Sequence, residues 1–381
     1  MDSTSKAKDS QSDDNIILAA DQGRLDLVTT LLENGVDPNT VDEVGTSALH
    51  NAAKQGHWEI ARLLLERNAS PHIKDGNNAT PIILAAKAGQ KQTARLLLEC
   101  GIPISEMDER EAGTLVRVAA VSGHTEIVQL LLDLNAPTLV MTGKETALHL
   151  AAKKGYHDIC DLLLKHDKNL TRSIWERMTG PALEVYSKDY TGVIPFHYAV
   201  TKNHEKTVEV FLRNHPDLAS AYDKDKEPFF FDPIHSVRVD LVRIFLENGV
   251  DIELKGKYGQ RALHKAVAAD RRKEWNHLVD ADKTSEIIHL LLAHGASVTA
   301  KDNYGVTPEL CTMDPKMRMI LRNHAVVRSK GEKLPSVPKV SAPPPEYRET
   351  ATRIPNETGI IWKVGSPVHS SSTDTLAEPI I

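Results

Sequence analysis

Four histidines, three cysteines and a proline-rich segment are the parts of this sequence whose residue types could do chemistry. The histidines are His50, His149, His197 and His264, and imidazole can transfer protons or bind a metal ion. Each follows an apolar residue, and an alanine stands two positions later. Catalysis and metal binding need several such groups to converge on one point. Recurrence at the same place in separate segments instead predicts a structural role, so we expect no catalytic residue, no metal site and no cofactor.

The three cysteines are Cys100, Cys160 and Cys311. They have neither metal-ligand spacing nor an evident pairing partner, and none is accompanied by the histidine and orienting residue that a nucleophile needs. The glycines form no phosphate-binding loop. We therefore expect a protein that is not an enzyme, in a reducing compartment, the cytoplasm and/or the nucleus.

Charge and hydropathy argue against two classes of partner, nucleic acid and the membrane interior. The net charge of −6 gives no reason to expect nucleic acid. No apolar run approaches the roughly 20 residues of a membrane span, so we expect no membrane insertion. We expect a monomer whose partner is another protein.

The elements that position these residues are best seen in residues 42–74. Ala48, Leu49, Ala52 and Ala53 form the apolar face of a short helix, which Gly56 ends. A second helix carries the leucine run at 63–65. Two short helices bury too little surface to fold alone, so this unit needs neighbours.

Those neighbours recur along the chain. The residue that ends each leucine run is Glu33, Glu66, Glu99 and then Asp133, a spacing of about 33 residues. The later run ends are Lys165, Arg213, Glu247, Ala293 and Arg322. Two of the later intervals are longer, by about 15 and about 13 residues, which predicts two insertions.

The repeated motif itself is Thr-Pro-Leu-His-x-Ala-Ala, which appears at 47–53, 80–86 and 146–152 with substitutions, and more weakly at 194–199 and 261–266. This pattern resembles the ankyrin repeat. The resemblance implies an all-α ankyrin-repeat solenoid of about nine helix-turn-helix repeats, with histidines that brace the turns through hydrogen bonds. It also implies an adaptor or scaffold that binds a partner protein through the concave surface of the array.

Three regions follow from composition. Residues 1–12 read as a disordered leader, residues 13–326 as the ankyrin-repeat array, and residues 327–381 as a disordered Pro/Ser/Thr-rich tail. We place the insertions near 166–188 and 270–284. The first contains Trp175, Met178 and Tyr186, which fits either a flap docked on the array or a partner contact.

The seventh repeat is degenerate, because Pro228 and Pro233 flank three phenylalanines where the first helix should be. Prolines disfavour a regular helix there. We expect a distorted repeat packed with aromatic side chains; the alternative is an exposed phenylalanine cluster that binds a ligand.

The tail contains a Pro-Pro-x-Tyr motif formed by Pro344, Pro345 and Tyr347. It resembles the ligand of WW domains, because consecutive prolines hold a polyproline II helix already formed and the tyrosine fills a second pocket. A proline-rich segment can also match this pattern by chance.

On the array, we place the partner at Tyr190, Tyr258 and Tyr304, which recur in turns of the C-terminal half. The alternative function is a small-molecule-binding sensor or an unusual enzyme, with a pocket in the irregular repeats lined by Trp175, 229–231 and Trp275. A third possibility is a regulatory part of a larger receptor.

Overall fold

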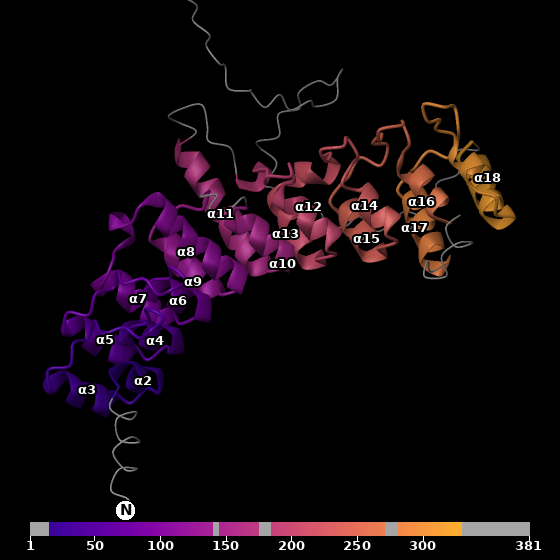
Figure 1. Cartoon of the computed structure of the whole chain (residues 1–381). Helices are drawn as coiled ribbons and strands as arrows, with labels where there is room; N and C mark the ends of the chain where they lie inside the picture. Colours follow the sequence, from indigo (N-terminus) through magenta and orange to yellow (C-terminus); the bar gives the residue numbers. More distant parts are fainter. Residues whose placement is uncertain (1–14, 140–144, 175–183, 271–280, 330–381) are drawn as a thin grey trace, which may run out of the picture. The chain divides into compact units, whose positions relative to one another are not determined.

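The computed structural model describes residues 15–139, 145–174, 184–270 and 281–329 of the 381-residue chain (Figure 1). Within these ranges the chain forms α-helices, short 3-10 helices and two isolated β-bridges, and no strand. The all-α prediction is confirmed. The expected leader, Trp175, Met178, Trp275 and the tail with Pro344, Pro345 and Tyr347 lie outside the described residues.

Helices follow one another in pairs along the first part of the chain. The pairs are α2 (Ile16–Asp21) with α3 (Leu25–Glu33), α4 (Ala48–Gln55) with α5 (Trp58–Glu66), α6 (Pro81–Ala88) with α7 (Lys91–Cys100), and α8 (Glu109–Ser122) with α9 (Thr125–Asp133). A 3-10 helix, η1 (Ile104–Glu106), precedes α8.

The pairing continues through the rest of the array. It comprises α10 (Ala147–Lys154) with α11 (His157–Ile174), α12 (Pro195–Thr201) with α13 (Glu205–Asn214), α14 (Phe231–His235) with α15 (Val239–Glu247), α16 (Ala262–Asp270) with α17 (Ala281–Ala293), and finally η5 (Pro308–Cys311) with α18 (Pro315–Ser329). The 3-10 helices η2 (Glu184–Tyr186) and η3 (Pro216–Ser220) lie between pairs. Helix α18 runs past residue 326, where we expected the array to end.

Two rows of helices result. The first helices of successive pairs contact one another from α2 through α16 to η5, and the second helices do so from α3 to α17 (Figure 1). Small side chains make the first row possible, since Ala48, Ala52 and Ala53 on α4 are fully buried. Leu64 and its counterparts fill the space between the rows. Each repeat therefore gains most of its buried surface from its neighbours.

The tight turn inside each of the first five pairs, from α2–α3 to α10–α11, contains a glycine with positive φ. Gly89, for example, ends α6 with φ of 81°, a left-handed conformation that a Cβ atom makes costly. A Cβ there would also lie 2.7 Å from the ring of His124 in the next pair. The glycine thus permits both the turn and the close approach of the neighbouring repeat.

The seventh repeat differs in part from its prediction. A short helix, α14, does form, because Pro233 lies within its first turn, where a backbone N–H has no helical partner to lose. The predicted aromatic packing is confirmed: Phe229, Phe230 and Phe231 are buried. The ring of Phe229 meets Phe196 edge-on, with centroids 5.5 Å apart. These three side chains belong to the core and not to an exposed ligand site.

None of the helices in the described ranges is both long enough and apolar enough to cross a membrane.

Candidate functional site

Five of the turns that join successive helix pairs share one hydrogen-bonded design. In the first of them the Oδ1 atom of Asp42 accepts from the backbone N–H of Val44 at 2.9 Å and of Thr46 at 2.7 Å. The carboxylates of Asp75, Asp189, Asp223 and Asp302 accept from the same two relative positions. The aspartate therefore fixes the loop conformation locally, as short polar side chains do in turns.

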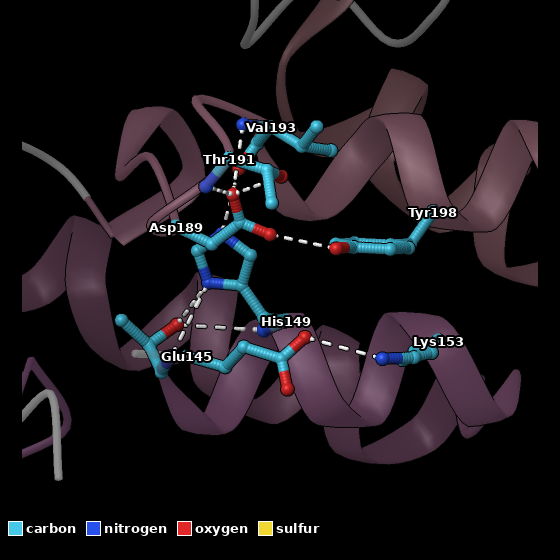
Figure 2. Close-up of polar contacts among 8 residues, drawn as sticks. Glu145, His149, Lys153, Asp189, Thr191, Val193 and Tyr198 are labelled. Carbon is cyan, nitrogen blue, oxygen red and sulfur yellow. Dashed lines mark hydrogen bonds and ion pairs between the residues drawn. The ribbon is translucent and has the colours of Figure 1, made fainter. Parts of the chain in front are cut away.

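A buried histidine links three of these turns, those of Asp75, Asp189 and Asp302, to the first helix of the preceding pair. The Nδ1 atom of His149 accepts from the backbone N–H of Thr146 at 3.3 Å, so its Nε2 atom carries the proton and donates to the carbonyl of Val193 at 3.0 Å (Figure 2). His50 and His264 repeat this arrangement with the carbonyls of Ala79 and Val306. The bracing role that the family resemblance implied is confirmed for His50, His149 and His264.

These three imidazoles are held in the neutral form. Burial lowers the pKa of His50, His149 and His264 and outweighs the nearby carbonyls and carboxylates that raise it. Both ring nitrogens of each are already engaged in hydrogen bonds. They have no free nitrogen to offer a substrate or a metal ion.

One acidic network stands out beside His149. The carboxylate of Asp189 accepts from the Tyr198 hydroxyl at 2.6 Å as well as from Thr191, and Glu145 pairs with Lys153 at 3.3 Å (Figure 2). Burial opposes ionisation of Asp189, but these hydrogen bonds lower its pKa to about 2. Burial, and then the bond to Asp189, raises the pKa of Tyr198 to about 12. Both groups are committed to the turn, which leaves neither available as an acid or a base near neutral pH.

Two members of the series depart from this design. His197 donates instead to the side chain of Asp232, with 3.1 Å between Nε2 and Oδ2. In the next turn Gly256 takes the place of the aspartate, and Glu227 from the preceding repeat accepts from the Lys257 N–H at 3.3 Å. A Cβ at Gly256 would lie 2.4 Å from Glu227 and 2.9 Å from Phe231. At Gly256 a contact between repeats thus stands where the other turns have a local one, and at His197 one contact between repeats replaces another.

The three tyrosines singled out from the sequence all lie on exposed turns. Tyr190 is 68% exposed, Tyr258 46% and Tyr304 73%. The rings of Tyr258 and Tyr304 are neighbours, with centroids 6.4 Å apart. Tyr190 lies on an earlier turn and follows the turn aspartate, Asp189, by one position. Tyr304 and Val44 follow the aspartates of their own turns by two positions. The structure brings two of the three together and offsets the third.

Sequence reasoning overlooked the basic character of the same turns. Six lysines on the turns at 188–192, 223–227, 255–259 and 301–305 are exposed: Lys188, Lys224, Lys226, Lys255, Lys257 and Lys301. Their recurrence near each turn aspartate or its replacement was visible in the sequence and could have revealed them. Exposed charges on the turns at 41–46 and 108–111 are mainly acidic: Asp42, Glu43, Asp108 and Glu109.

A small hollow lies between two of these turns. Its lining includes Lys188, His197, Tyr222, Lys224 and Phe229, and its volume is about 60 Å³. A second hollow of about 190 Å³ lies between α7 and α9, beside Pro103 and Leu134. Sites for drug-sized ligands usually measure about 300 to 1,000 Å³, so each of these holds a small group at most. The described residues form no cluster of metal-ligating side chains.

Comparison with known proteins places these observations in a family. Two segments, residues 16–108 and 104–174, each match the family described as ankyrin repeats (3 copies). A stretch of 200 residues, 51% of the chain, is 28% identical to the potassium channel AKT2/3 of Arabidopsis thaliana, and covers 20% of that protein. A stretch of 202 residues, 53% of the chain, is 25% identical to a homologue of transient receptor potential cation channel subfamily A member 1 from Caenorhabditis elegans, and covers 14% of it.

The match thus spans only a small part of either channel. The turn and histidine geometry of the matched repeats continues beyond residue 174, since Asp302, His264 and Val306 repeat the bonds seen at Asp42, His50 and Ala79. The chain therefore contains ankyrin repeats over residues 16–174, and its later helix pairs repeat their turn and histidine geometry.

Proposed function

We propose that this protein is a non-catalytic adaptor that binds a partner protein through the exposed turns of its C-terminal repeats. Ankyrin repeats in general indicate protein–protein interaction. The observation that carries the proposal for this chain is the adjacent pair Tyr258 and Tyr304, exposed on turns whose backbone is already fixed. Tyrosine is enriched among the residues that dominate binding energy at interfaces. We include Tyr190 in the same surface.

A preformed surface of this kind favours affinity. The turn carrying Tyr304 is held by the two hydrogen bonds to Asp302, and its Asn303 N–H donates to the carbonyl of Tyr258 at 3.0 Å. Little backbone ordering remains to be done when a partner arrives, so less free energy is lost on association.

A second part of the proposal concerns the tail. Pro344, Pro345 and Tyr347 would recruit a WW-domain protein, bringing it to the partner that the repeats hold. The protein works as a monomer in the cytoplasm and/or the nucleus.

The relatives do not extend this proposal to ion conduction. Their printed names describe channels, and the matched stretch is 20% of one and 14% of the other. What the stretch shares with them is consistent with a binding role, and we propose no channel activity for this chain.

An affinity pull-down separates the two binding parts. The intact chain is compared with Tyr258→Ala/Tyr304→Ala, with Tyr347→Ala and with a truncation after Ser329. Val44→Ala is the matched control, because Val44 is 61% exposed at the same turn position in an early repeat.

One set of proteins should be lost with the double tyrosine variant, and a different set with both tail variants. Retention of every protein by the double tyrosine variant would contradict the proposed surface. Retention by both tail variants would contradict WW-domain recruitment.

A further inference from the structure

The exposed turns of the C-terminal repeats carry an excess of positive charge. Besides Lys188, Lys224, Lys226, Lys255, Lys257 and Lys301, the exposed charged residues of the four turns include a single acid, Asp225. None of the six lysines forms an ion pair with another residue in the described ranges. The other carboxylates of these turns, Asp189, Asp223, Glu227 and Asp302, are buried or half-buried, so positive charge dominates the exposed surface. We call these lysines, with Tyr190, Tyr258 and Tyr304, the lysine–tyrosine edge.

Hydrogen bonds join the four turns of this edge in sequence. The Lys224 side chain donates to the carbonyl of Thr191 at 3.4 Å. The Lys257 N–H donates to Glu227 at 3.3 Å, and the Asn303 N–H donates to Tyr258 at 3.0 Å. The charges and rings therefore sit on one continuous support.

The length of the edge suggests the form of its occupant. Packed helices lie about 8 to 10 Å apart, so four consecutive turns span about 30 Å. An extended chain covers about 3.3 Å per residue. A segment of about nine extended residues would therefore reach from the first turn to the last.

The hollow between the first two turns suggests an anchor for that segment. Lys188, Lys224 and one carboxylate, Asp223, line it together with His197, and Tyr222 and Phe229 contribute apolar surface. A cavity of about 60 Å³ accepts a carboxylate and its methylene stem, since one water needs about 10 to 15 Å³ on the same measure. Asp223 already accepts hydrogen bonds from the N–H groups of Asp225 and Glu227, and the two lysines outnumber it, so the walls favour a negative charge.

We infer that the lysine–tyrosine edge binds an acidic, extended peptide segment of the partner, with one carboxylate side chain seated in the hollow beside Lys188 and Lys224. This inference rests on the proposed function and adds the chemical class of the partner. Charge complementarity sets specificity and speeds association, and the tyrosines supply the apolar contact that limits dissociation.

Nucleic acid is the other polyanion that lysine and tyrosine can bind, but two observations favour a peptide. The hollow is too small for a base. The acidic turns with Asp42, Glu43, Asp108 and Glu109, and the net charge of −6, repel a long polyanion that runs along the array.

The test is a selection of random ten-residue peptides, displayed on phage, against the full-length chain. We expect the selected peptides to be enriched in aspartate and glutamate. Synthetic copies should bind the variant Lys188→Glu/Lys224→Glu at least about tenfold more weakly, and added salt should weaken binding to the natural chain.

The matched control is Lys74→Glu/Arg110→Glu, which makes the same change of net charge on exposed turns of the early repeats. Its affinity for the peptides should equal that of the natural chain. Equal loss in both variants would overturn the inference, because binding would then follow net charge and not the edge.

Two further outcomes separate this inference from the proposed function. Neutral or basic peptides that depend on Tyr258 and Tyr304 would refute the acidic class and leave the binding surface in place. Peptides insensitive to every edge variant would refute both. A ten-nucleotide thymidine strand that binds more tightly than any selected peptide, and is lost in Lys188→Glu/Lys224→Glu, would overturn the inference in favour of nucleic acid.

Discussion

The Nε2 atom of His149 lies 3.0 Å from the carbonyl oxygen of Val193, although 44 residues separate them in the chain. His50 and Ala79 make the same bond across 29 residues, and His264 and Val306 make it across 42. The differences, 15 and 13 residues, leave the contact unchanged. The bond joins the first turn of a helix in one repeat to the loop that begins the next repeat. Extra residues inserted between these two segments therefore leave the stacking of the repeats intact.

Removing His149 tests how much this bond contributes. His149→Ala leaves the Val193 carbonyl and the Thr146 N–H without their partner, and it opens a cavity where a buried ring stood. We expect a loss of about 2 to 4 kcal/mol in the free energy of unfolding of the repeats around it. The buried thiol of Cys160 in α11 offers a local reporter, because it reacts with a thiol reagent only when this part of the array opens.

The control for this measurement is His72→Ala, since His72 is exposed. Cys160 should become reactive at lower urea in His149→Ala than in the control. Equal urea midpoints would contradict the bracing role.

The neutral histidines predict a pH dependence. An unfolded histidine has a pKa of about 6.5, and burial lowers the folded pKa of His50, His149 and His264 below that value. Below pH about 6.5 the unfolded chain therefore binds protons that the folded chain does not bind. Stability should be fully present above about pH 7 and should fall as the pH drops toward 5, by up to about 1.4 kcal/mol per pH unit for each histidine.

Urea midpoints between pH 7.5 and 5 measure this slope. A variant with His149→Asn should show a shallower fall over that range than the natural chain, whereas His72→Asn should match the natural chain. If the urea midpoint of the natural chain did not change between pH 7.5 and 5, protonation of the three imidazoles would not destabilise the folded chain.

Asp189 and Tyr198 give a spectroscopic prediction. Burial and then the Asp189 carboxylate raise the pKa of the Tyr198 phenol to about 12. Asp189→Asn keeps a hydrogen-bond acceptor but removes the charge, so the pKa of Tyr198 should fall toward the ordinary value of about 10. Alkaline titration of tyrosinate absorbance, compared with Tyr198→Phe to identify the signal, measures the change. A Tyr198 that still ionises near pH 12 in Asp189→Asn would show that burial alone sets its pKa.

The neighbouring rings of Tyr258 and Tyr304 give a prediction on binding. Each single alanine variant should weaken partner binding by about 1 to 3 kcal/mol, because exposed aromatic residues at the centre of an interface contribute most of its energy. The two losses should not add, since the ring centroids lie only 6.4 Å apart. A double-mutant cycle by calorimetry checks this. Additive losses would mean that the partner contacts the two rings independently.

The sequence predicted the fold because its evidence recurs. One weak repeat proves little, but His50, His149 and His264 stand in the same phase of their segments and make the same bond. The short helix α14 was missed because a proline rule was applied without the position of Pro233 in the first turn.

The candidate site was harder to predict, since its contacts join residues that are distant in the chain. Nothing local to Gly256 reveals that Glu227, from the preceding repeat, accepts a hydrogen bond from the Lys257 N–H of this turn. The offset of Tyr190 from the position of Tyr304 appears only when the bonds to Asp189 and Asp302 are aligned. The hollow beside Lys188 and Lys224 likewise depends on how two turns meet.

The central claim, that the C-terminal turns bind a protein, is tested most directly by crosslinking from single positions. A photoreactive amino acid is placed at position 304 in one protein and at position 44 in another, on equivalent and exposed sites of late and early turns. After irradiation in cell extract, we predict one defined adduct from position 304 that disappears with Lys188→Glu/Lys224→Glu and is absent from position 44. The same adducts from both positions, or none from position 304, would contradict the claim.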